Sequence, residues 1–250
     1  VKLSKGLGEI SVVILSQGEE VDSMDFPFDG VTLVKSKSLG LSRSRNALIK
    51  YLHGEYIWLV DDDVVINGLC LDVVMSKLHG PDNPDVLIGR IECSDTEKCE
   101  YYKNYKARRG LAGLLKTSSI ELIMNKDFIV RNNITYNEIL GLGAKYPCGE
   151  ENYFLVECWI NKARVFFYDE TFIYHPCSEK GLSNLKYFST KNHLMSRVLL
   201  TKKLPLRFSI FYAFKILIIL IIKKRDIKMA LFFIKALLRG KKLGDFSSAN

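Results

Sequence analysis

The chain has 250 residues, of which 48% are hydrophobic and 26% charged, and this composition excludes a disordered or fibrous protein. The net charge of +8 is unevenly distributed. Residues 181–250 hold 15 lysines and arginines against two acids, whereas residues 1–180 hold 21 basic against 26 acidic residues. An acidic body with a strongly basic tail predicts two tasks, and the partner of the tail should be anionic, either nucleic acid or an anionic membrane surface.

The six cysteines form no Cys-x-x-Cys pair and show no zinc-type spacing, which excludes a zinc-binding framework of the usual kind. The first residues, VKLSKGLGEISVVIL, contain no long apolar stretch followed by a small-residue cleavage site. We therefore expect a cytoplasmic protein with reduced and mostly buried thiols.

Short apolar runs alternate with segments of helical periodicity in the first half of the chain. Strands are predicted at residues 10–15, 31–34, 56–60 and 86–91. Helices are predicted from Ser42, a plausible N-cap, to Gly54, and over residues 69–78. This order is typical of an α/β fold with a mostly parallel central sheet flanked by helices, which binds ligands beyond the carboxyl ends of its strands.

The second half continues the pattern up to residue 178, where we place the end of the α/β domain. The remaining predicted elements are a Tyr-rich helix over 97–116, a strand over 119–124, a Gly-rich loop over 141–152, a helix over 150–162, and short strands over 165–168 and 172–174.

Residues 179–250 are predicted to form a separate helical tail. Its apolar segment, residues 208–222, would make about 22 Å of helix, which is shorter than the roughly 30 Å hydrocarbon core of a membrane. The next segment places basic residues on one helical stripe, namely Lys224, Lys228, Lys235, Arg239 and Lys242. We expect helices that lie on an anionic membrane, although packing of the tail on the domain is the alternative.

Three aspartates follow the apolar strand in YIWLVDDDVVIN. On an extended strand Asp61 and Asp63 point to one side, and Asp62 points to the other, toward backbone or helix N–H groups. A D-x-D pair at the carboxyl edge of a sheet suits Mg²⁺ or Mn²⁺, which prefer oxygen ligands and leave positions open for phosphate.

Two segments carry a resemblance to a known family: GLSRSRNALIKYLHGEYIWLVDDD and GEENYFLVECWINKARVFFYDETFIYHP. Their order and spacing over residues 10–176 resemble the family 2 glycosyltransferases of the GT-A (Rossmann-like) fold. That family typically shows a (S/A)RN helix start, a D-x-D, a G-E-D at a helix start and a Y-x-H after a short strand pair. The resemblance implies transfer of a sugar from a nucleotide-diphosphate donor to an acceptor hydroxyl.

The resemblance also implies roles for the residues of the first segment. Asp61 and Asp63 would hold a cation that bridges the diphosphate, with Asp62 also on the nucleotide side. Arg43 or Arg45 could pair with phosphate, since a guanidinium suits phosphate oxygens, and the family's RN falls on Arg45 and Asn46.

In the second segment Glu151 takes the last position of the G-E-D motif and is the candidate general base, with Glu150 as its competitor. Both acids could instead simply favour the positive end of a helix. A side-chain base implies inversion of configuration. His175 falls where some members place a histidine near the diphosphate or metal, and a neutral imidazole could complete the coordination.

The chain departs from the family pattern at the nucleotide base. No acid follows the second predicted strand, where the family places an aspartate, so Ser16, Gln17 or a backbone contact would substitute. We expect a UDP-linked sugar as donor.

We expect an inverting, metal-dependent glycosyltransferase on the inner membrane face, with a lipid-linked glycan of bacterial surface polysaccharide as acceptor. Residues 101–105 and the GLGAKYP loop would line the acceptor site. A nucleotidyltransferase and a non-enzymatic basic protein that binds nucleic acid or membrane are the alternatives. The tail mixes charge with long aliphatic runs, which favours lipid over nucleic acid.

Overall fold

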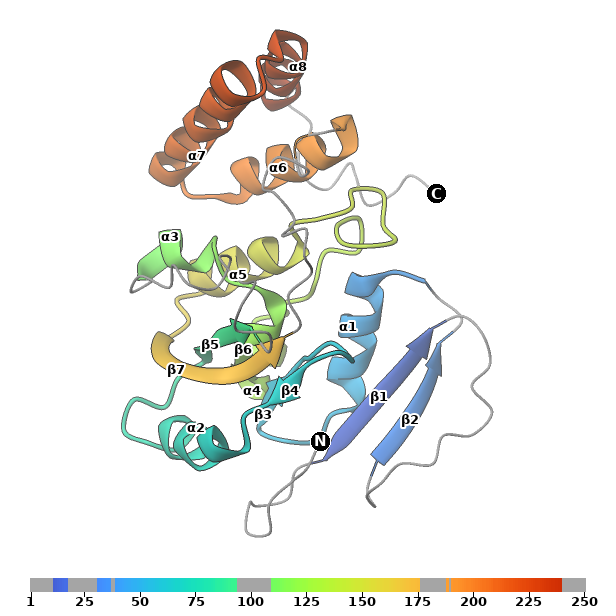
Figure 1. Ribbon diagram of the computed structural model, residues 1–250, viewed down its shortest axis with the longest axis vertical. Helices are drawn as coiled ribbons and strands as arrows, with labels where there is room; N and C mark the ends of the chain where they lie inside the picture. The colour runs from blue at the N-terminus through green and yellow to red at the C-terminus, as the bar shows by residue number, and fades with distance from the viewer. Residues whose placement is uncertain are drawn as a thin grey trace.

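The computed structural model describes residues 11–17, 31–36, 39–93, 109–175, 188 and 190–239, and its strands lie in two sheets (Figure 1). A parallel pair is formed by β1 (Val12–Gln17) and β2 (Val31–Ser36). The second sheet has five strands in the order β3 (Tyr56–Trp58), β6 (Leu122–Asn125), β5 (Val86–Cys93), β7 (Val165–His175) and β4 (Val65–Ile66).

The five-stranded sheet is mixed. Pairings β3–β6, β5–β6 and β4–β7 are antiparallel, and β5–β7 is parallel. The prediction of an α/β fold with a central sheet flanked by helices is confirmed, but "mostly parallel" was wrong in detail, because antiparallel β6 lies between β3 and β5. These pairings still give β3, β5 and β7 one direction, so their carboxyl ends share one edge of the sheet.

Helices cover both faces of this sheet. On one side lies α2 (Leu71–Leu78), which follows a 3₁₀ turn, η1 (Gly68–Cys70), and on the other lies α5 (Glu150–Ile160) (Figure 1). The side chains of β5 alternate accordingly: Val86 and Ile88 belong to the core with α5, and Leu87 to the core with α2.

Shorter elements complete the catalytic part. They are α1 (Leu41–Tyr51), α3 (Gly110–Leu114), the 3₁₀ turn η2 (Ser119–Glu121) and α4 (Lys126–Arg131). The strand predicted over 119–124 begins only at Leu122, and α4 and β4 were not predicted. Most of the helix predicted over 97–116 lies outside the described residues.

Strand β7 is continuous, whereas two short strands were predicted. Its register against β5 shifts on both sides of Arg90, so the pairing is irregular there. Gly89 lies beside this irregularity. The ring of Phe172 leaves no room for a side chain at this position, since a Cβ on Gly89 would lie 1.8 Å from Phe172 Cδ2.

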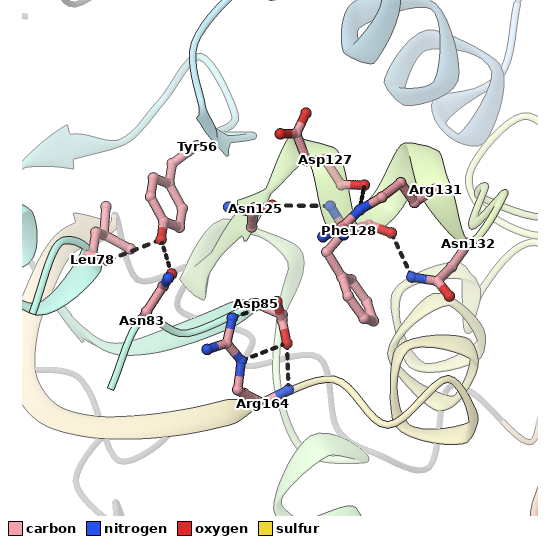
Figure 2. A network of polar contacts seen from close by, with 10 residues as sticks. All are labelled: Tyr56, Leu78, Asn83, Asp85, Asn125, Asp127, Phe128, Arg131, Asn132 and Arg164. Atoms are coloured by element: carbon pink, nitrogen blue, oxygen red, sulfur yellow. Dashed lines mark hydrogen bonds and ion pairs between the residues drawn. The ribbon is translucent and has the colours of Figure 1, made fainter. Parts of the chain in front are cut away.

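The opposite edge of the sheet is fixed by a polar network (Figure 2). The carboxylate of Asp85, just before β5, accepts hydrogen bonds from the backbone N–H, Nε and Nη2 of Arg164, just before β7, at 2.8, 3.1 and 3.1 Å. Burial alone would raise the pKa of Asp85, but the hydrogen bonds and charge of Arg164 outweigh it and lower the pKa.

The C-terminal part forms a helical layer beyond α5 (Figure 1). It contains α6 (Lys191–Lys203), α7 (Leu206–Ile218), a π-helical turn η4 (Ile219–Lys223) and α8 (Ile227–Leu238). The predicted tail helices are present, whereas α6 was not predicted. None of the helices in the described part of the chain is long and apolar enough to span a membrane.

Candidate active site

The centre of the candidate site is a buried guanidinium on α1. Helix α1 begins after Gly40, whose φ of 125° suits glycine, and no side chain caps it. The predicted N-cap, Ser42, was wrong: its Oγ donates instead to the carbonyl of Leu140 at 2.6 Å. Together with the hydrogen bond from Leu41 N–H to the Leu142 carbonyl at 2.9 Å, this holds α1 against the Gly-rich loop.

Arg45 points from α1 to the start of α5. Its Nη1 donates to Glu150 Oε1 at 3.0 Å and its Nη2 to Ser119 Oγ at 2.7 Å, and its guanidinium lies 5.4 Å from the ring centre of Tyr136. The Arg45 and Glu150 side chains are only 6% and 8% exposed. The structure thus commits Arg45 to protein partners, which differs from the predicted contact with phosphate.

The neighbours of Arg45 on α1 also contact protein groups, and their roles at the donor stay predictions. The Asn46 amide clamps the backbone of Tyr136: its Oδ1 accepts from Tyr136 N–H at 2.8 Å and its Nδ2 donates to the Tyr136 carbonyl at 2.9 Å. Asn46 is therefore a structural residue. Arg43 Nε lies 3.3 Å from Glu138 Oε2, and both side chains are about half exposed, so Arg43 is the one of the two arginines that remains open to solvent.

Helix α5 begins with the two candidate bases. Gly149 precedes them with φ of 86°, a left-handed conformation that explains the glycine of the motif. Glu150 turns inward to Arg45, whereas Glu151 is partly exposed and has a pKa raised to about 8. The main cause is desolvation, followed by the adjacent charge of Glu150, while Arg45 acts in the opposite direction.

The three aspartates lie beyond the end of β3. The strand ends at Trp58, and the aspartates follow in an irregular turn, so the prediction from strand alternation was wrong. All three side chains are exposed. The surrounding protein nevertheless removes enough water from Asp61 to raise its pKa, and the charges of Asp63 and Asp62 add to this, whereas Arg45 and His175 oppose it.

His175 closes the site from β7. Strand β4 pairs with β7 so that Val65 lies opposite Tyr174, and this register brings His175 next to Asp63. His175 Nε2 lies 3.5 Å from Asp63 Oδ1, and the buried Nδ1 has no hydrogen-bond partner among the described residues. Asp63 and His175, two of the predicted metal ligands, therefore lie next to each other at the carboxyl edge of the sheet, and the charge of each affects the pKa of Asp61.

These residues fit a divalent cation that is completed by its substrate. Over residues 39–93, 109–175 and the other described parts, no group of three or more His, Cys, Asp or Glu side chains is close enough to form a protein-only metal site. Mg²⁺ and Mn²⁺ commonly bind through one or two carboxylates plus water and phosphate oxygens. Asp61 and Asp63, with the Nε2 atom of His175 beside Asp63, are compatible with that type of site.

Of the remaining predicted site residues, the structure describes only some. Ser16 and Gln17 end β1, and Gln17 Nε2 donates to the Gly40 carbonyl at 3.4 Å, next to the start of α1. The roles of Ser16 and Gln17 at the nucleotide base stay predictions. Residues 101–105, predicted at the acceptor, lie outside the described residues.

Several residues of the site were missed by sequence reasoning. Ser119 and Tyr136 contact Arg45, and Gly141 packs on Glu150, since a Cβ there would lie 3.2 Å from Glu150 Cδ. The Gly-rich motif was the one available signal, because Gly141 has φ of 100°. Ser119 and Tyr136 carry no comparable local signal.

Comparisons with known proteins agree with this geometry. Residues 19–140 match the family described as glycosyl transferase family 2. None of the curated proteins compared with the chain matches it in sequence.

Three solved structures share the fold. S. aureus TarS 1–349 is 15% identical, with a TM-score of 0.54, and the match covers 86% of this chain and 76% of TarS. The same fragment in complex with UDP-GlcNAc is 17% identical, with a TM-score of 0.55 and coverage of 87% and 59%. Mannosyltransferase PcManGT from Pyrobaculum calidifontis, in complex with GDP-Man and Mn²⁺, is 11% identical, with a TM-score of 0.51 and coverage of 87% and 60%.

The chain spans about three fifths of the length of the latter two chains. At these identities the likeness establishes the GT-A fold.

Proposed function

Because this chain is a family 2 glycosyltransferase, we propose that it moves a sugar from a nucleoside-diphosphate donor to an acceptor hydroxyl with inversion at the anomeric carbon. One observation carries the proposal. Arg45 forms a buried ion pair with Glu150 at the start of α5, and its charge also acts to lower the pKa of Asp61, which follows β3. A UDP-linked donor is favoured by the similar fold of TarS, which was solved with UDP-GlcNAc.

Glu151 is the proposed base. Glu150 is buried in its ion pair with Arg45, whereas the Glu151 side chain is partly exposed, which favours Glu151 as the carboxylate that meets an acceptor. Desolvation and the charge of Glu150 raise the pKa of Glu151, which makes its carboxylate a stronger base than an ordinary glutamate. The acceptor oxygen attacks the anomeric carbon as its proton passes to Glu151 Oε, and the bond to the nucleoside diphosphate breaks with its electrons on the phosphate oxygen.

Asp61, Asp63 and His175 would hold the divalent cation proposed for this site. When bound, such a cation neutralises negative charge on the departing diphosphate. The fold neighbour PcManGT was solved with Mn²⁺, which supports a cation of this type. The chain's own contribution is to keep two carboxylates and an imidazole nitrogen at one edge, where they attract the cation.

The C-terminal helices support a peripheral membrane location and a lipid-linked glycan acceptor. Their inner faces are used, because Ile216, Leu220 and Phe233 pack together in a core with α6. Large apolar side chains still face solvent, among them Ile210, Phe211, Phe214, Ile222, Ile227 and Leu231. Exposed basic residues lie among them, including Lys215, Lys223, Lys228, Lys235 and Arg239. Apolar and basic groups together suit an anionic membrane better than nucleic acid.

A panel of nucleotide sugars tests the proposed reaction. With Mn²⁺ present, one donor should raise the melting temperature and be consumed when an acceptor is added, and EDTA should remove both effects. Asp61→Ala with Asp63→Ala should abolish the protection, whereas Asp82→Ala, which removes another aspartate outside the site, should not. Protection that survives the double substitution would refute the proposed diphosphate site.

Vesicle flotation tests the membrane proposal. The chain should float with vesicles of phosphatidylglycerol and phosphatidylcholine, and less with phosphatidylcholine alone. Phe211→Asp with Phe214→Asp should reduce flotation without changing donor protection. DNA retention at the same salt concentration, without flotation, would favour the nucleic-acid alternative instead.

A further inference from the structure

The face of the five-stranded sheet that carries α5 ends in charged side chains. Along β5, Val86 and Ile88 pack in the core with α5, whereas Ile91 packs in the core with α2. Side chains alternate along a strand, so Arg90 and Glu92 point to the α5 face. Val86 and Ile88 are buried, but the Arg90 and Glu92 side chains are 33% and 36% exposed. This face is therefore partly open to solvent at the carboxyl end of β5.

The charged residues on this face are tied to each other and to β7. Arg90 Nη2 forms a hydrogen-bonded ion pair with Glu92 Oε1, and Arg90 Nη1 lies 3.6 Å from Asp169 Oδ1. The contact between Arg90 and Glu92, two residues apart on one strand, agrees with their position on the same face. Arg90 thus orients both carboxylates, and the three side chains together carry one net negative charge.

The last residues of β7 and β4 continue this surface beside Glu92. Glu92 lies opposite Tyr174 on β7, and Tyr174 lies opposite Val65 on β4. Adjacent strands are about 4.8 Å apart, so opposed residues on one face are direct neighbours. Tyr174 is partly buried, whereas Val65 is 61% exposed, so the surface is open at β4. Arg90, Glu92, Tyr174 and Val65 form the edge row, in which charged, aromatic and aliphatic side chains lie side by side.

The edge row adjoins the candidate active site. The residue of β7 that follows the row is His175, whose Nε2 lies 3.5 Å from Asp63 Oδ1. The row also lies on the α5 face, and the first turn of α5 holds Glu151, the proposed base. Helix α5 ends just before Arg164, at the opposite edge of the sheet, so its first turn lies toward the carboxyl edge. The row is thus next to the proposed diphosphate site and on the side of the sheet that carries the base.

We propose that the edge row is the subsite that binds the sugar of the acceptor. Glu92 and Asp169, held by Arg90, accept hydrogen bonds from sugar hydroxyl groups. Tyr174 and Val65 supply apolar contact to the carbon atoms of the sugar ring. The net negative charge of the ion-paired group favours a neutral sugar over one that carries a carboxylate or phosphate. The inference rests on the proposed function, because it takes the α5 face as the side from which the acceptor loses its proton.

Binding of methyl glycosides tests the subsite without use of sugar transfer. The probes are methyl β-D-glucopyranoside, methyl β-D-galactopyranoside and methyl β-D-glucuronopyranoside, measured by saturation-transfer NMR on the full chain with UDP and Mn²⁺. A neutral glycoside should bind the unsubstituted chain, and the glucuronide should bind more weakly. Glu92→Gln should weaken binding of the neutral glycoside about tenfold, since a hydrogen bond to a charged group is lost. Absence of binding by both neutral glycosides, or tighter binding of the glucuronide, would overturn the inference.

Glu170→Gln is the matched control. It removes an acid next to Asp169 on β7, but Glu170 accepts a hydrogen bond from Tyr168, which packs against the core with α2 on the opposite face. This variant should bind the glycoside like the unsubstituted chain. Val65→Trp, at an exposed position, leaves the ion pair in place and should block the edge row. Equal glycoside affinity in Glu92→Gln, Val65→Trp and Glu170→Gln would overturn the inference.

Donor protection in the same variants separates this inference from the proposed function. The melting-temperature rise with nucleotide sugar and Mn²⁺ should be unchanged in Glu92→Gln. Retained donor protection with unaltered glycoside binding would refute the acceptor subsite alone. Glycoside binding that depends on Glu92, in a chain that no nucleotide sugar protects, would refute the proposed function and leave the subsite intact. Loss of donor protection with retained glycoside binding would assign Glu92 to the donor sugar and overturn the inference.

Discussion

Replacement of Arg45 by methionine should cost far more stability than its place on a surface helix suggests. The substitution keeps most of the side-chain length but removes the charge that Glu150 faces at 3.0 Å. It also removes the donor to Ser119 and the cation over Tyr136. Glu150 would remain as a buried carboxylate without its counter-charge.

The expected loss follows from burial. Both partners of the pair are less than one tenth exposed, and removal of one partner of a buried ion pair typically costs about 3–5 kcal/mol. Arg43 provides a matched control two residues away, because its pair with Glu138 is about half exposed on both sides. Arg43→Met should therefore cost less than about 1 kcal/mol.

Urea unfolding of five chains measures this: the unsubstituted protein, Arg43→Met, Arg45→Met, Glu150→Gln, and the double variant of Arg45→Met with Glu150→Gln. The double variant should regain part of the loss, since a neutral pair leaves no buried charge. If Arg45→Met costs no more than Arg43→Met, the site is not organised around a buried ion pair, and the reasoning is refuted.

Three further substitutions test the frame of the site by urea unfolding. Asp85→Asn should cost about 2 kcal/mol at neutral pH by weakening the contacts with Arg164. Because the folded pKa of Asp85 is lowered, its contribution to stability is complete above about pH 4 and is lost as pH falls through the folded pKa. The unfolding free energies of Asp85→Asn and the unsubstituted chain should therefore converge in acid. A difference that does not change with pH would contradict this. Gly89→Ala should cost about 3 kcal/mol through its clash with Phe172, and unchanged stability would contradict the close packing. Asn46→Ala should lower stability by about 2 kcal/mol with donor affinity unchanged, whereas lost affinity at constant stability would restore its predicted role at the donor.

Local sequence patterns predicted the helices of the site well. Helix α5 begins at Glu150 as predicted, because the Gly149 motif and the following apolar residues are local signals. The start of helix α1 was predicted two residues too late, with Ser42 in place of Gly40 as the N-cap. The reason is that Ser42 bonds to Leu140, almost a hundred residues away in sequence, and no local pattern reports such a partner.

The order of the strands and the surroundings of the charged site residues also depend on segments distant in sequence, which local patterns do not report. Strand direction depends on which segments pair, and β6 lies between β3 and β5 although it follows both in the chain. The D-x-D motif lies in a turn after Trp58 and not on the strand from which alternation was argued, and its role as a metal ligand stays a prediction. Helix α6 was not predicted, and its packing on α5, α7 and α8 joins segments that are distant in sequence.

The most direct test of the central claim compares Glu151→Gln with Glu150→Gln in transfer and in donor protection. Glu151→Gln should lower the transfer rate by about 10²- to 10⁴-fold while the melting-temperature rise with donor and Mn²⁺ is retained. Glu150→Gln keeps a hydrogen-bond partner for Arg45 and should retain more transfer than Glu151→Gln. Transfer by Glu151→Gln at the rate of the unsubstituted chain would contradict the assignment of the base.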